Sequence, residues 1–391
     1  MAALLMATAC SSPESEAIRV GVILDYTGDA SATGFNLERA GLLAARSVRA
    51  ARPGETEIQC VFGDSQGDPE RAAEVAREFV AQGVVAVIGP AGDELVSAAA
   101  TPLEEAGVPL ISPIATNGDA DAVEPMPWFR LAPSHELLSE NLAKAVYERG
   151  ISRVGIVRAP DVYHERLASV FSAEFIDLGG EVALDVPLGP TDPLTDAVQA
   201  IEVARDQGVS GFVVALNALP AARLITEVAI AQDTVPQWFL TPRVKSDVFI
   251  INTPASAIEG AIGISPNVFL VDSPAFIQAY GDAWTNDVPF EDSYFMYDAT
   301  ALLLLSIDRA LRMNGTVDRG SLEAALFDTA ATGGVQVEWN GLADAIQWNS
   351  VGRGIQYTGV TGPLLFAPNG QRRSGKTTVW TIRERAIVNL E

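Results

Sequence analysis

Two short apolar runs in the first third of the chain each end in a loop that carries polar, turn-forming residues. The first run, 84–88, leads into the loop 89–94, and the second, 108–111, leads into the loop 112–117. The stretch 93–107 between them has the pattern of a helix, so the order is strand, loop, helix, strand, loop. Ligands bind just beyond the carboxyl ends of strands in open α/β sheets. The two loops therefore predict a small-molecule site.

Other patterns that could do chemistry are weaker. Residues 370–377 fit the phosphate-loop pattern G-x-x-x-x-G-K-T, but a turn precedes them and a β-rich segment follows where a helix would be needed, so we interpret them as a basic surface turn. The two histidines, His135 and His164, cannot form a metal cluster, and no nucleophile elbow is present. His164 follows Tyr163 on an expected post-strand loop, where it could touch a ligand. We predict no enzyme, no cofactor and no metal.

The overall composition limits the classes of partner. The chain has 391 residues, of which 48% are hydrophobic, and a formal net charge of −24. This length allows two or three domains with their own cores. So acidic a surface repels phosphate backbones, and we expect no nucleic-acid binding.

The N-terminus has a lipoprotein-like pattern. A short apolar run ends in small residues and Cys10, as in the tail of a bacterial lipoprotein signal, and cleavage before Cys10 would leave it as the lipidated first residue. Ala7 stands where Leu is usual and no basic region precedes the run, so a chance apolar terminus is the alternative. Cys60 is expected to fill the core face of a strand. No other run approaches the length of a membrane helix.

Strands and helices alternate along most of the chain, which predicts an α/β fold. Two βα series of similar size, one before and one after residue 131, indicate two doubly wound lobes with parallel sheets. Two later segments are expected to behave differently. Residues 332–354, rich in Gly, Asn and Trp, resemble a long surface insertion, and 363–366 and 378–382 alternate like paired strands.

Several short motifs, taken in order, resemble the type I periplasmic-binding-protein fold in its branched-chain amino-acid-binding group, over residues 18–388. They are Ile18-Arg19-Val20-Gly21-Val22, Thr27-Gly28, Gly67-Asp68-Pro69, Val87-Ile88-Gly89-Pro90, Glu105-Ala106-Gly107-Val108-Pro109, Ile111-Ser112-Pro113, Phe129-Arg130-Leu131-Ala132-Pro133-Ser134, Gly359-Val360-Thr361-Gly362-Pro363 and Asn369-Gly370.

This resemblance implies a Venus-flytrap clamp whose two lobes are joined by three crossover segments and close on a solute. We expect a signal remnant and tether at 1–17, a first lobe from 18–131 and 265–362, and a second lobe from 132–264 and 363–391. The resemblance further implies a monomer in the periplasm or at the cell surface, lipid-anchored to a membrane through Cys10, that delivers a small-molecule solute to an ABC permease.

In amino-acid binders of this family, the first lobe holds the ligand carboxylate with hydroxyls and backbone amides. The serine that the loop after Pro90 should supply falls on Asp93, with Glu94 beside it. The threonine of the second loop is kept. We therefore expect that loop to bind through three residues, Ala115, Thr116 and Asn117.

The second lobe of such binders stacks a tyrosine on the ligand and holds its ammonium with a carboxylate. The tyrosine is kept as Tyr163. The carboxylate position reads Thr241-Pro242-Arg243 and is basic, and the aromatic residue expected after Leu216 is replaced by Asn217.

The charges are thus inverted, with an acid in the first lobe and a base in the second. One interpretation is that Asp93 caps its helix and Arg243 is solvated. The other is that both face the cleft, where an unpaired buried charge costs several kcal/mol. We then expect an amino-acid-like or carboxylate-bearing solute whose anionic end meets Arg243. The alternatives are a lipoprotein that regulates a cell-envelope enzyme, and a ligand sensor.

Overall fold

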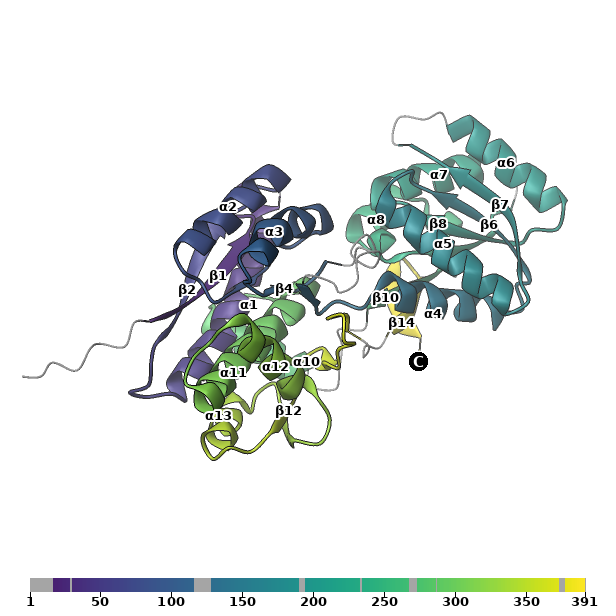
Figure 1. Cartoon of the computed structure of the whole chain (residues 1–391). Helices are drawn as coiled ribbons and strands as arrows, with labels where there is room; N and C mark the ends of the chain where they lie inside the picture. The colour runs from purple at the N-terminus through teal and green to yellow at the C-terminus, as the bar shows by residue number, and fades with distance from the viewer. Residues whose placement is uncertain are drawn as a thin grey trace, which may run out of the picture.

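The computed structural model describes residues 17–28, 30–115, 128–189, 194–232, 234–266, 273–285, 287–372 and 377–390. These residues form two α/β lobes that lie side by side, each built on its own sheet (Figure 1). The predicted α/β fold with parallel sheets is confirmed. In these ranges, no helix is both long enough and apolar enough to span a bilayer.

The first lobe has a five-stranded parallel sheet in the order β2-β1-β3-β4-β5. Its elements are β1 (Ile18–Leu24), α1 (Ser31–Ala50), β2 (Ile58–Asp64), α2 (Pro69–Ala81), β3 (Ala86–Ile88), α3 (Asp93–Glu105), β4 (Leu110–Ser112), β5 (Trp128–Arg130), α10 (Ser273–Ala283), α11 (Glu291–Asn314), α12 (Arg319–Ala330) and α13 (Leu342–Ser350). Successive side chains of a strand point to opposite faces. In β1, Val22 and Leu24 therefore enter the core that α1 and α11 cover, while Ile23 enters the core that α2 and α3 cover.

The second lobe has a seven-stranded sheet in the order β15-β14-β10-β9-β8-β6-β7, in which β14 and β15 are antiparallel to their neighbours. Its elements are α4 (His135–Tyr147), β6 (Arg153–Arg158), α5 (Val162–Asp177), β7 (Glu181–Pro187), α6 (Leu194–Asp206), β8 (Gly211–Ala215), α7 (Ala218–Ala231), β9 (Gln237–Leu240), η2 (Pro242–Val244), α8 (Asp247–Asn252), α9 (Ala255–Ile258), β10 (Ile262–Pro266), β14 (Thr377–Arg383) and β15 (Ala386–Leu390). In β8, Val214 packs in the core with α6 and α7, and Val213 packs in the opposite core with α4 and α5.

Residues 332–354 are not a surface insertion, which corrects that prediction. They include β11 (Val335–Glu338) and α13, and β11 joins β12 (Ile355–Gly359) and β13 (Gly362–Pro363) in a small third sheet. Trp339 is buried, with its ring 5.5 Å from that of Phe276 and 5.8 Å from that of Tyr297. Aromatic packing therefore makes this segment part of the core of the first lobe.

The predicted pairing of 363–366 with 378–382 is also wrong. β13 pairs with β12, whereas β14 pairs with β10 on one side and β15 on the other. The C-terminal hairpin thus extends the sheet of the second lobe, as the yellow strands of Figure 1 show.

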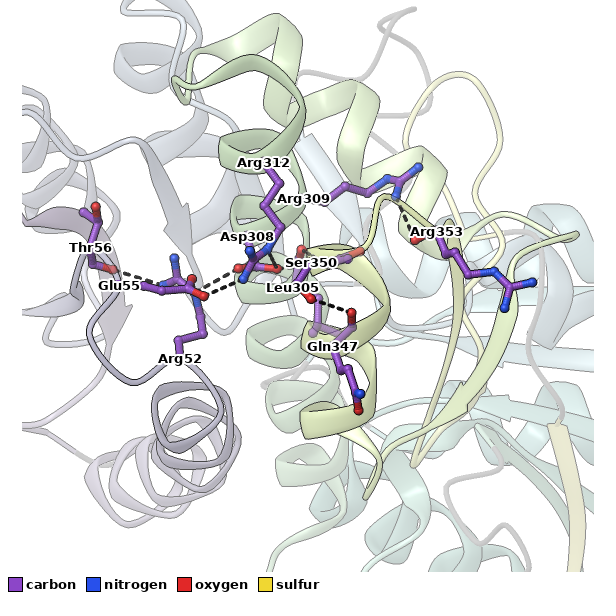
Figure 2. Close-up of polar contacts among 11 residues, drawn as sticks. Arg52, Glu55, Thr56, Leu305, Asp308, Arg309, Arg312, Gln347, Ser350 and Arg353 are labelled. Atoms are coloured by element: carbon purple, nitrogen blue, oxygen red, sulfur yellow. Dashed lines mark hydrogen bonds and ion pairs between the residues drawn. The ribbon is translucent and has the colours of Figure 1, made fainter.

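Buried charges join α1 to α11 within the first lobe. Arg52 donates a 2.9 Å hydrogen bond to the fully buried Asp308, which also accepts one of 3.0 Å from Arg312 (Figure 2). Glu55 lies between the two arginines and pairs with both. Arg52 lies two residues beyond the end of α1, so its ion pair with the buried Asp308 ties that end of α1 to α11.

A second buried network lies where the chain passes between the lobes. Arg372 donates hydrogen bonds to the carbonyl oxygens of Leu131, Thr361 and Pro363 and to the Thr361 hydroxyl, at 2.7–2.9 Å. Burial lowers the pKa of Arg372 to about 10. Asp298 of α11 accepts hydrogen bonds from the Thr361 amide and hydroxyl, at 2.8 and 2.6 Å. One guanidinium thus ties the segment after β5 to the segment before β14.

Candidate ligand-binding site

A cavity of about 410 Å³ lies between the lobes. This cleft cavity is lined by residues of both lobes: Gly92, Asp93, Ile114, Glu291, Asp292 and Phe295 from the first, and Tyr163, Pro242, Arg243, Lys245, Ser265 and Pro266 from the second. Three larger hollows, of about 650–750 Å³, each lie within a single lobe. We take the cleft cavity as the candidate site because both lobes line it near the carboxyl ends of their strands.

The loop after β3 brings Asp93 to the cavity. Gly89 follows the strand with φ +83°, and a Cβ atom there would lie 2.1 Å from the carbonyl oxygen of Ile23. Only glycine allows this turn without displacing β1. Asp93 then begins α3, where the positive end of the helix dipole favours its carboxylate. Asp93 is not the cap residue, because Gly92 occupies that position.

Arg243 reaches the same cavity from the second lobe. It lies in η2, directly after β9, and its guanidinium stacks 3.6 Å from the ring centroid of Tyr163. A terminal nitrogen of Arg243 is 4.0 Å from a carboxylate oxygen of Asp93 across the cleft. The Arg243 side chain remains 43% exposed, so its N–H groups are accessible from the cavity.

Tyr163 forms a fixed platform beneath this arginine. It lies in the first turn of α5, whose cap residue Asp161 accepts hydrogen bonds from the backbone N–H of His164 and lies 2.8 Å from its ring Nδ1. The prediction that His164 lies on a post-strand loop is therefore wrong, because the helix already begins at Val162. Burial raises the pKa of Tyr163 to about 12, so its ring stays neutral. Burial also lowers the pKa of His164, against the opposing effect of Asp161.

Three ionisable residues of the cavity were not predicted from the sequence. Lys245 Nζ lies 3.0 Å from Oε1 of Glu291 across the cleft and 3.3 Å from the hydroxyl of Ser265. Asp292, next to Glu291, is half-buried, and its burial and the neighbouring charge raise its pKa to about 6. Glu291 and Asp292 lie in the first turn of α11. Acidic residues before an apolar helical run are the signal that could have placed them in its first turn.

The other predicted site residues lie elsewhere. Glu94 is exposed on α3, and Ala115 is buried in the first lobe with its amide bonded to the Ser112 hydroxyl at 3.1 Å. Asn217 is exposed before α7. None of these three lines the cleft cavity. The predictions for Thr116, Asn117 and Cys10 fall outside the described residues.

Known proteins resemble this chain over most of its length. A family model described as periplasmic binding protein matches residues 17–351. A putative branched-chain amino acid ABC transporter protein from Rhodospirillum rubrum is 23% identical, with a TM-score of 0.73, over 96% of this chain and 100% of that chain. A leucine binding protein from Thermotoga maritima is 19% identical, with a TM-score of 0.72, over 96% and 98%. A solute binding protein from R. palustris in complex with benzoate is 18% identical, with a TM-score of 0.69, over 96% and 96%. Comparison with curated proteins gives no significant match.

Proposed function

The chain belongs to the periplasmic binding protein family and has its type I fold, and we propose that it captures an amino-acid-like or carboxylate-bearing solute in the cleft cavity. The observation that carries the proposal is Arg243, whose accessible guanidinium stacks on Tyr163 at a cavity lined by both lobes. The loaded protein then delivers the solute to an ABC permease. We propose no catalytic role for any residue of the cavity.

A carboxylate is the group that Arg243 suits best. The planar fork of a guanidinium binds the two oxygens of a carboxylate side by side, with shorter and stronger hydrogen bonds than neutral groups make. At 4.0 Å, the contact of Arg243 with Asp93 is longer than a hydrogen bond, so a solute carboxylate can displace it. Leucine and benzoate, named for two of the similar proteins, share a carboxylate.

The family places the protein outside the cytoplasm, where it can meet such a solute. We further propose that lipidated Cys10 anchors it near its permease, and that it acts as a monomer. We also propose the predicted lobe bounds, 18–131 with 265–362 and 132–264 with 363–391, except that Ser265 and Pro266 belong to the second lobe because they are part of β10.

Isothermal titration with a panel of amino acids and organic acids tests the proposal. The wild-type protein should bind at least one solute, and Arg243→Ala should weaken binding by about tenfold or more, because a hydrogen bond to a charged group contributes about 1.5–3 kcal/mol. Arg77→Ala removes an exposed arginine of α2 and serves as the control, with unchanged affinity. Equal affinity in wild-type and Arg243→Ala protein contradicts the role of Arg243.

Failure of the whole panel to bind would favour the alternatives, a regulatory partner of a cell-envelope enzyme or a ligand sensor. A surface insertion at 332–354 would have offered the regulatory alternative a separate interaction surface. That segment packs in the core of the first lobe, so it no longer supports a separate interaction surface.

A further inference from the structure

The charged groups of the cleft cavity do not all have partners. Its walls carry two cations, Arg243 and Lys245, and three carboxylates, Asp93, Glu291 and Asp292. Arg243 faces Asp93, and Lys245 is bonded to Glu291. Each cation therefore has a carboxylate from the opposite lobe, and one carboxylate remains.

That remaining group is Asp292. Within the described part of the chain, no hydrogen bond or ion pair involves its side chain, although the side chain is only partly exposed. A half-buried carboxylate without a partner is unfavourable, because burial removes water that would otherwise solvate the charge. The raised pKa of Asp292 reflects this situation. A cation that enters the cavity with the solute would supply the missing partner.

The backbone around Asp292 is held in place from another helix. Asn36 of α1 accepts a 2.7 Å hydrogen bond from the amide of Phe290 and one from the hydroxyl of Ser293, and it donates one of 3.0 Å to the carbonyl oxygen of Val288. These bonds flank Asp292 on both sides, and Asn36 is itself buried. The carboxylate is thus carried by a rigid support, as a recognition residue requires.

We propose that Asp292 is a specificity-determining residue that binds the ammonium group of the solute, so that the cavity selects amino acids over carboxylates of the same skeleton. The inference rests on the proposed function and deepens it. The solute carboxylate lies against Arg243 of the second lobe, and its ammonium lies against Asp292 of the first. A carboxylate without an ammonium leaves Asp292 unpaired in the closed cleft.

Matched ligand pairs test this assignment. Leucine with 4-methylpentanoate, and phenylalanine with 3-phenylpropanoate, differ only by the ammonium group. Isothermal titration of the full chain at pH 7.5 should give at least tenfold tighter binding of the amino acid in one or both pairs. In Asp292→Asn the preference should fall to threefold or less, mainly through weaker binding of the amino acid. Asp282→Asn, which removes an exposed carboxylate of α10, should keep the preference of the wild type.

The outcomes separate this inference from the proposed function. A wild-type protein that binds each member of a pair equally, or an Asp292→Asn protein that keeps the tenfold preference, overturns the role of Asp292 and leaves carboxylate capture intact. A wild-type protein that binds neither member of either pair, nor any solute of the wider panel, overturns both. Circular dichroism of Asp292→Asn confirms that a lost preference does not come from unfolding.

Discussion

Replacing Asp292 by Asn should stabilise the protein in the absence of solute, and the gain should be largest at neutral and alkaline pH. The pKa of Asp292 rises from 3.8 to about 6, because the folded protein buries this carboxyl beside Glu291. A shift of about two units corresponds to about 3 kcal/mol against folding when the group is ionised in both states. The side chain is only half-buried, so solvent reduces this figure, and we expect a gain of about 1–2 kcal/mol from the neutral amide.

The sign of the pH dependence follows from the direction of the shift. Because the pKa is higher in the folded state, the folded protein takes up a proton as the pH falls through about 6, and the penalty fades and is absent below 3.8. Other charges that face Asp292 across the cavity are those of Asp93, Arg243 and Lys245. They are present in both variants, so the difference between Asp292→Asn and wild type isolates the one carboxyl.

Urea unfolding at pH 8.0 and pH 4.5, without solute, measures this difference. Asp282→Asn is the control, since it removes the same charge from an exposed position of a chain whose net charge is −24. A gain of equal size at both pH values would refute the reasoning. So would an equal gain in Asp282→Asn, because relief of general repulsion would then explain the effect.

Three further changes test other parts of the fold. Arg372→Met should lower the free energy of unfolding by about 3–5 kcal/mol in urea, because it leaves buried carbonyl oxygens without a donor and removes the positive charge near the buried Asp298; a loss under 1 kcal/mol would contradict this. Gly359→Ala should destabilise clearly, since its Cβ would lie 2.2 Å from Oδ2 of Asp298, and a melting temperature within 1 °C of wild type would show that the position adapts. His164 is buried with a lowered pKa, so its contribution to stability is present above pH 6.5 and lost as the pH falls; His164→Gln should flatten the decline in melting temperature between pH 7 and pH 5, and an unchanged decline would contradict this.

The site residues that could be predicted from the sequence are those that follow directly after the end of a strand. A strand followed by a glycine turn and a helix fixes where Asp93 stands relative to its own sheet, and the end of β9 followed by the short turn η2 does the same for Arg243. The structure brings these two residues within 4.0 Å of each other. Lys245 and Asp292 could not be predicted in this way, because their place in the cavity depends on how the two lobes meet.

The wrong prediction for residues 332–354 has a related cause. A stretch rich in glycine and asparagine suggests a loop, but Trp339 packs against the rings of Phe276 and Tyr297, and this contact draws 332–354 into the core. Local composition contains no information about which distant aromatic residues a segment will meet. The doubly wound lobes were predictable, in contrast, because alternation along a strand such as β1 is a local property that already requires helices on both faces.

The arrangement of charges in the cleft also disfavours a neutral solute. Asp93 and Arg243, like Glu291 and Lys245, come from opposite lobes, so each pair links the two lobes across the cleft. A neutral solute such as a sugar that entered between Arg243 and Asp93 would separate this ion pair without supplying a charge in exchange, which is unfavourable. A zwitterion replaces each lost partner with a charge of its own, because its carboxylate takes the place of Asp93 at Arg243 while its ammonium meets the carboxylates of the first lobe. Titration with neutral sugars and amides should therefore give no binding under conditions in which an amino acid binds, and a neutral solute of comparable affinity would show that the ion pairs of the cleft do not open when it is filled.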